Sequence, residues 1–196
     1  MTDLQRKKIW DPVTRVWHWV LVLAIMITWP FGKFMSFDTV IWHFYLGYFI
    51  LGLMLVRLLW GLVGPKSIRL RYLVPKPASL IAYIKTLRLK TPSGTPGHNP
   101  IGALSVIAML IVITLQAITG LFIESEDFFE YGPLNEYVSE ETMKFMLGWH
   151  HTLSDVIIIL IALHISAIMF YLIWKNENLI KPMINGWKWV KRDDQQ

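Results

Sequence analysis

Long apolar runs without charge alternate with short polar segments along this chain. Residues 16–32, 39–56, 101–123 and 156–174 contain no Asp, Glu, Lys or Arg. The second run continues past Arg57 through residues 58–63, and the fourth begins near Trp149. Each run approaches or reaches the roughly 20 residues that a helix needs to cross a bilayer. The pattern predicts an all-α integral membrane protein, a four-helix bundle forming one domain over residues 1–196.

Composition agrees with this prediction and narrows the chemistry. Hydrophobic residues make up 54% of the chain and charged residues only 17%, which is less charge than a soluble domain of this size carries. The chain has no cysteine. It therefore cannot form disulfides, hold an iron–sulfur cluster on thiolates or attach a c-type haem covalently. A redox group would have to be held without a covalent bond, and histidine is the available ligand.

The distribution of basic residues predicts the orientation in the membrane. They gather before the first run, between the second and third, and after the fourth, whereas the other two connections carry only Lys33 and Lys144. By the positive-inside rule both termini and the long 2–3 connection are cytoplasmic. Because the basic residues are distributed according to the membrane topology, the net charge of +5 does not indicate nucleic-acid binding. The first run follows a basic start but lacks a small-residue cleavage site, so we interpret it as a retained span.

Two connections have features of their own. Residues 78–90 mix apolar and basic positions in a way that suits a short amphipathic helix on the cytoplasmic surface, although an ordinary interfacial loop would also fit. Residues 124–141 carry seven acidic side chains against none that are basic. This segment is either a solvated acidic loop or a docking surface for a basic periplasmic redox protein.

Four histidines lie within or at the ends of the apolar runs, at two depths. His150 and His164 are 14 residues apart, which places them on one helix face about 21 Å from each other. With the predicted topology, His18 lies level with His164 near the cytoplasmic side, and His43 lies level with His150 near the outer side. Ionisable side chains inside a membrane indicate function, although interhelical hydrogen bonds are an alternative. The two pairs predict two haem irons, each bound by two neutral imidazoles and each suited to carrying electrons.

Several neighbouring residues leave alternatives open. His151 lies about 220° round the helix from His164, so His150 is the better ligand. Arg57 follows His43 by 14 residues, where it would pair with a haem propionate or extend to the headgroups. Glycines allow a macrocycle or a neighbouring helix to approach closely, namely at Gly47, Gly52, Gly102 and Gly120.

The chain resembles the bacterial cytochrome b561 family and the b-type cytochrome subunits of nickel–iron hydrogenases. The matching stretches are residues 10–19 (WDPVTRVWHW), His43 with 56–64 (VRLLWGLVG), 97–102 (GHNPIG), 149–153 (WHHTL) with His164, and 174–179 (WKNENL). The resemblance implies two haem b groups, with His18 and His164 on the cytoplasmic-side iron and His43 and His150 on the periplasmic-side iron. It also implies a multi-pass protein of the bacterial inner membrane that exchanges electrons with quinone in a respiratory chain.

Three functions are compatible with these sequence features. The first is electron transfer between the quinone pool and a periplasmic partner such as a c-type cytochrome or a hydrogenase. The second is a self-sufficient superoxide:quinone-type oxidoreductase, which the acidic outer loop disfavours because it would repel an anion. The third is a non-redox membrane anchor. Whether the chain is itself an enzyme stays open, with an electron-transfer subunit preferred.

A quinone site needs a titratable group close to a haem edge near the membrane surface. On the inner side His98 and Asn99 precede the third run, at the level of Arg57. On the outer side His151 and Asp155 share a helix face, although they would equally suit a surface pair. We prefer the inner residues, His98 and Asn99, as the quinone site.

Overall fold

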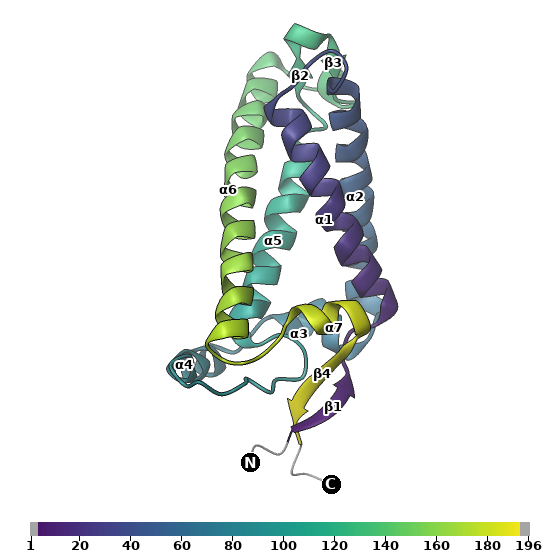
Figure 1. Ribbon diagram of the computed structural model, residues 1–196. Helices are drawn as coiled ribbons and strands as arrows, with labels where there is room; N and C mark the ends of the chain where they lie inside the picture. Colours follow the sequence, from purple (N-terminus) through teal and green to yellow (C-terminus); the bar gives the residue numbers. More distant parts are fainter. Residues whose placement is uncertain (1–3, 193–196) are drawn as a thin grey trace. The chain divides into compact units, whose positions relative to one another are not determined.

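The computed structural model describes residues 4–192, apart from the side chain of Glu126, and is mostly helical (Figure 1). Four helices in this part of the chain are long and apolar enough to cross a membrane, namely α1 (Pro12–Lys33), α2 (Val40–Val63), α5 (Pro100–Thr119) and α6 (Glu140–Ile173). Each covers most of one of the four predicted runs. The prediction of four spanning helices is therefore confirmed, with α6 beginning well before the apolar run it contains.

Side-chain caps fix where the spanning helices begin. Asp11 precedes α1, and its two carboxylate oxygens accept hydrogen bonds from the Thr14 amide (3.0 Å) and the Thr14 hydroxyl (2.6 Å). Asn99 precedes α5, and its Oδ1 accepts a bond from the Gly102 amide at 2.8 Å. Both satisfy amide groups that have no partner within the helix. Pro100 then occupies the first helical position, where a missing amide costs nothing.

The chain divides into two compact units. The first unit comprises Met1–Val16, Leu58–Ala108 and Ile161–Gln196, and the second comprises Trp17–Arg57 and Met109–Leu160.

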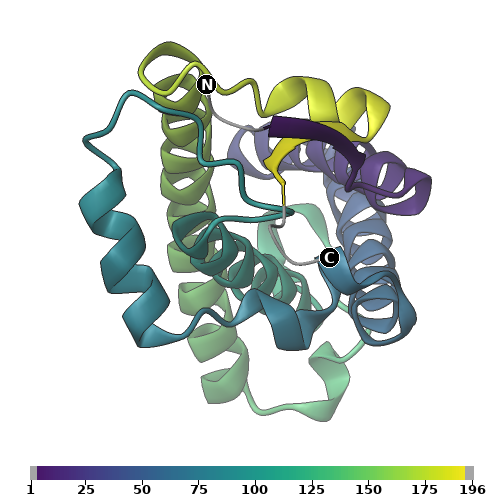
Figure 2. The same ribbon diagram turned by 90° about the horizontal axis from the view of Figure 1, so that it is seen from below.

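A short sheet in the first unit joins two segments that lie far apart in the sequence. Strand β1 (Leu4–Lys8) pairs antiparallel with β4 (Trp187–Lys191), in a register that sets Arg6 opposite Trp189 (Figures 1 and 2). Along β4 exposed and buried residues alternate, so that Lys188 and Val190 point inward. Val190 belongs to a small core with Ile9, Trp10 and Ile68. This sheet, whose strands are only five residues long, was not predicted from the sequence.

A glycine closes the turn that leads from α7 (Ile180–Asn185) into β4. Gly186 has φ 85°, a left-handed conformation that glycine adopts without strain. Its carbonyl accepts bonds from the amides of Ile9 and Trp10, and a Cβ at this position would lie 2.7 Å from the Trp10 carbonyl oxygen. The close approach of the two segments therefore requires glycine here.

Two buried lysines hold the loops of the first unit together. Lys175 is 2% exposed, and its ammonium donates to the carbonyls of Thr86, Leu89 and Thr91 at 3.0–3.3 Å. Lys188 forms a buried ion pair with Glu177 at 3.2 Å. The Glu177 carboxylate also accepts bonds from the amide and hydroxyl of Ser93.

The predicted surface helix is present as α4 (Pro77–Thr86), in agreement with the amphipathic interpretation of residues 78–90. It starts on Pro77 and ends at Thr86, and residues 87–90 continue as turns. A 3-10 turn at Lys66–Ile68 and the single helical turn α3 (Leu70–Leu73) precede it. In the second unit the acidic segment is ordered by β2 (Glu124–Ser125) and β3 (Glu130–Tyr131), which pair antiparallel.

Candidate haem site

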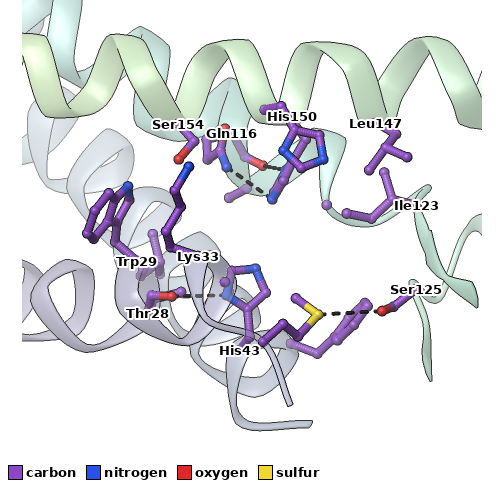
Figure 3. Close-up of a pocket in the computed structure, with 18 of the residues that line it drawn as sticks. Thr28, Trp29, Lys33, His43, Gln116, Ile123, Ser125, Leu147, His150 and Ser154 are labelled. Atoms are coloured by element: carbon purple, nitrogen blue, oxygen red, sulfur yellow. Dashed lines mark hydrogen bonds between the residues drawn. The ribbon is translucent and has the colours of Figure 1, made fainter. Parts of the chain in front are cut away.

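Two histidines of the second unit face one another across a cavity. His43 comes from α2 and His150 from α6, and their ring centres lie 6.2 Å apart with the rings nearly perpendicular, at 81°. Figure 3 shows the two imidazoles on opposite sides of the cavity, pointing toward each other. The structure thus brings together one of the two predicted histidine pairs.

Each imidazole is oriented through its Nδ1 atom. His43 Nδ1–H donates to the Thr28 carbonyl at 3.0 Å. His150 Nδ1–H donates to the Gln116 carbonyl at 3.1 Å and lies 3.1 Å from the Thr119 hydroxyl. Backbone carbonyls that hold Nδ1–H in this way select the tautomer whose Nε2 carries a free lone pair, which is the usual arrangement of a metal-binding histidine. In this tautomer both Nε2 atoms are acceptors that could bind a metal, which at His150 would take the place of a hydrogen bond from the Gln116 amide.

The cavity between the histidines is about 650 Å³ and is lined mainly by apolar side chains. Its polar lining includes Gln116, whose amide lies 3.0 Å from His150 Nε2. Lys33 points into the cavity near Trp29 and Ser154 (Figure 3). Acidic residues also line it, namely Glu124, Asp127 and Asp155. An apolar cavity with a few convergent polar groups is the usual form of a cofactor site.

Glycines make room for the imidazoles and for the cavity. A Cβ at Gly32 would lie 2.5 Å from His43 Cε1, and one at Gly120 would lie 3.2 Å from His150 Cε1. Gly47 also lines the cavity, and nothing stands within 4 Å of where its Cβ would be. The first two glycines let the rings take their positions, and the third leaves the cavity wall open.

These features fit a haem held by two histidines. A metal–imidazole bond is about 2 Å long, so two imidazoles on opposite sides of one iron have ring centres about 6 Å apart. The observed 6.2 Å agrees with this separation. The glycine-lined cavity and the Nδ1–H bonds to backbone carbonyls are the other features that suit such a group.

The remaining predicted residues lie as follows. His151 is exposed at the edge of the cavity, next to His150. Arg57 is only 3% exposed, and its guanidinium stands 5.8 Å from the centre of the Trp17 ring, so the side chain lies inside the protein and does not extend to the headgroups. His18 is half-buried in α1 beside Trp19, and His164 is half-buried in α6. Their pairing stays a prediction.

The proposed quinone residues belong to the first unit. His98 is half-buried, with its ring 4.7 Å from that of Trp10. Asn99 is buried and caps α5. Asn99 thus has a clear structural role, whereas His98 is the titratable member of the two.

Sequence reasoning missed the residues that orient the ligands. Thr28, Gln116 and Thr119 act through carbonyl and hydroxyl groups, which leave no residue-type signature in a single sequence. Gly32 was also missed. The signal available for it was its place at the end of an apolar run, four residues after Thr28 and therefore on the same helix face.

Comparison with known proteins identifies the family of the chain. The sequence model of the family described as prokaryotic cytochrome b561 matches residues 9–186. The chain is 24% identical to a probable Ni/Fe-hydrogenase B-type cytochrome subunit of Azotobacter vinelandii, over 94% of this chain and 89% of that protein. It is likewise 24% identical to a probable Ni/Fe-hydrogenase 1 B-type cytochrome subunit of Escherichia coli K12, over 92% and 89%. With nearly its whole length matched, this chain belongs to the prokaryotic cytochrome b561 family, membrane b-type cytochromes that carry haem b and transfer electrons.

Proposed function

We propose that this protein is a di-haem cytochrome b that transfers electrons between the quinone pool and a periplasmic redox partner. The observation that carries the proposal is the pair His43 and His150, which face each other across a cavity with each Nδ1–H held by a backbone carbonyl. Haem held by two histidines supplies a one-electron iron couple with no open coordination position. Such a site favours electron transfer over oxygen chemistry.

The first role of the chain's own residues is to hold and orient the cofactor. His43 and His150 bind the periplasmic-side iron, while the Thr28 and Gln116 carbonyls fix their rings. Because these carbonyls also raise the basicity of the imidazoles, they influence the redox potential.

A second haem on His18 and His164 rests on the 14-residue spacing within α6 and on the family. Arg57 lies 14 residues after His43 on α2, and its burial supports a role beside this cytoplasmic-side haem. A haem propionate near the Arg57 guanidinium would form a charge-assisted hydrogen bond with it.

The orientation with both termini cytoplasmic is also a proposal, as is a single domain of the inner membrane over residues 1–196. The pairing of β1 with β4 supports it, since residues close to both ends of the chain meet in one sheet. An even number of spans satisfies this pairing, and the positive-inside rule then favours the cytoplasmic side.

The acidic segment 124–141 is the proposed docking surface for a basic periplasmic redox protein. Three of its aromatic side chains are exposed, namely Phe129, Tyr131 and Tyr137. Exposed aromatic residues among charges of one sign are typical of protein-binding surfaces. The relatives' names indicate a hydrogenase as one kind of partner, and a c-type cytochrome is another.

A quinone site near His98 is the proposed cytoplasmic-side end of the electron-transfer path. His98 supplies a titratable group close to α5, as quinol oxidation requires. The superoxide:quinone-type activity remains the second candidate, and the acidic surface disfavours it because superoxide is an anion. A membrane anchor that uses its histidines only for packing is the third.

A pyridine haemochrome assay of the purified protein tests the proposal directly. We expect about two haem b groups per chain, each bound by two histidines and neither able to bind carbon monoxide. A ratio of one haem per chain would contradict the proposal that His18 and His164 bind a second haem. A colourless protein would leave the non-redox membrane anchor as the remaining function. Slower haem reduction by a quinol analogue in His98→Ala, with both haems retained, would support the inner quinone site. Unchanged kinetics would contradict it.

A further inference from the structure

Helix α4 presents two apolar stripes, and the first unit covers only one of them. Leu80, Tyr83 and Leu87 are half-buried and share one face, because they are three and four residues apart. The Tyr83 hydroxyl is hydrogen-bonded to the Tyr171 hydroxyl at 2.7 Å. This stripe fastens α4 to the protein.

The second stripe faces outward. Ile81 and Ile84 are three residues apart, and they are 58% and 49% exposed. Leu89 follows just beyond the helix and is 55% exposed. Exposing two isoleucines on adjacent turns to water is unfavourable, so a surface of this kind normally has a partner.

The charges beside the outward stripe are of one sign. Lys85 directly follows Ile84, Arg88 lies four residues after it, and both are exposed. No acidic residue occurs between Asp38 and Glu124, whereas seven basic residues lie between positions 66 and 90. A partner that matches this surface therefore has an apolar region against the isoleucines and negative charge against the neighbouring basic side chains.

Contacts with the end of α6 set α4 at the level where that helix leaves its apolar run. The Lys175 ammonium, two residues after α6 ends, binds the carbonyls that follow the last turn of α4. The Lys90 ammonium lies 4.4 Å from the centre of the Trp174 ring, and tryptophan is enriched at membrane–water interfaces. Both chain ends of this connection also return to spanning helices, α2 and α5.

We propose that α4 lies in the membrane surface and binds anionic phospholipid. Ile81 and Ile84 enter the boundary between headgroups and acyl chains, and Lys85 and Arg88 bind the headgroup phosphates. Figure 2 shows α4 as a separate helix of the connection between α2 and α5. The inference does not depend on the haems, because it rests only on contacts of the first unit.

The absence of cysteine allows a clean test with single labels in the haem-loaded full chain. Ile81→Cys and Ser79→Cys place a fluorophore on nearly opposite sides of α4, since two residues correspond to ~200° round a helix. Each protein is reconstituted into vesicles of phosphatidylcholine alone, or with phosphatidylglycerol in equal parts, containing brominated acyl chains. We expect strong quenching of the label at 81, little at 79, and more at 81 when phosphatidylglycerol is present. Ile84→Cys should repeat the result at 81.

The charges are tested in the Ile81→Cys background. The substitutions Lys85→Gln and Arg88→Gln each remove one positive charge. Each should lower the phosphatidylglycerol-dependent association of α4 with lipid by about fivefold. Lys181→Gln, an exposed lysine on α7, is the matched control and should leave it unchanged. Equal quenching at 79 and 81 would overturn the proposal, and so would equal quenching at 81 in the two lipid mixtures.

Discussion

The ring centres of His43 on α2 and His150 on α6 lie 6.2 Å apart. A backbone carbonyl from another spanning helix accepts a hydrogen bond from each imidazole. Thr28 of α1 serves His43, and Gln116 of α5 serves His150. All four spanning helices thus contribute to one site in the second unit. The geometry of this site therefore depends on how the four helix segments pack.

Replacing His150 should remove one haem, whereas replacing its neighbour should not. His150→Ala eliminates an Nε2 ligand that faces the cavity, while His151→Ala changes an exposed residue at its edge. We expect the haem content to fall by about half in the first variant and to stay unchanged in the second. The pyridine haemochrome assay measures both. A loss in His151→Ala alone would show that the ligand assignment is wrong.

Gly32→Ala should weaken the binding of the same haem without replacing a ligand residue. The added Cβ would lie 2.5 Å from His43 Cε1, so the ring would have to move from its position beside the Thr28 carbonyl. We expect lower occupancy or an altered potential for this haem only, measured by redox titration. Gly52→Ala is the control, since its Cβ would meet nothing within 4 Å. Equal behaviour of the two variants would exclude the steric argument.

Breaking the buried pair Glu177–Lys188 should destabilise the first unit. Burial lowers the pKa of Lys188, and Glu177 opposes this by favouring the charged form. Lys188→Met leaves the carboxylate with the Ser93 bonds but without its cation, which typically costs about 3–5 kcal/mol for a buried pair. Thermal unfolding in detergent measures the loss. The double variant Glu177→Gln, Lys188→Met should be more stable than the sum of the single effects indicates, because the two side chains interact directly.

The cap at the start of α1 predicts a dependence on acidic pH. Burial acts to raise the pKa of Asp11, but hydrogen bonds from Thr14 and Trp60 outweigh it and hold the pKa below the ordinary value of 3.8. Since the folded state binds the proton more weakly, this contribution to stability is complete above pH 3.8 and is lost as the pH falls through the lowered pKa.

Two variants separate the cap from its charge. Asp11→Ala should lower the free energy of unfolding by about 1 kcal/mol at neutral pH. Asp11→Asn should keep much of the cap but lose the acid-dependent step. Unfolding curves recorded at several pH values check both outcomes, and an acid-dependent step that persists in Asp11→Asn would assign it to another group.

The sequence by itself determined the spanning helices and one histidine pair that meets in the second unit. Runs of about 20 apolar residues leave a helix as the way to satisfy the backbone inside a membrane, so these elements follow from composition and length. The predicted topology also set His43 level with His150, because both lie toward the outer ends of their helices. The surface helix α4 followed from its amphipathic period, although its end at Thr86 did not.

Only the tertiary structure decided how the ligands are oriented and how the ends of the chain are joined. The Thr28 and Gln116 carbonyls are backbone groups that any residue carries, so their aim at Nδ1 depends on helix rotation rather than on side-chain type. The sheet of β1 and β4 joins residues 179 to 187 positions apart by backbone bonds, and each strand is only five residues long. Local periodicity records which face of an element is apolar, whereas contacts between distant backbones depend on how the packed elements meet.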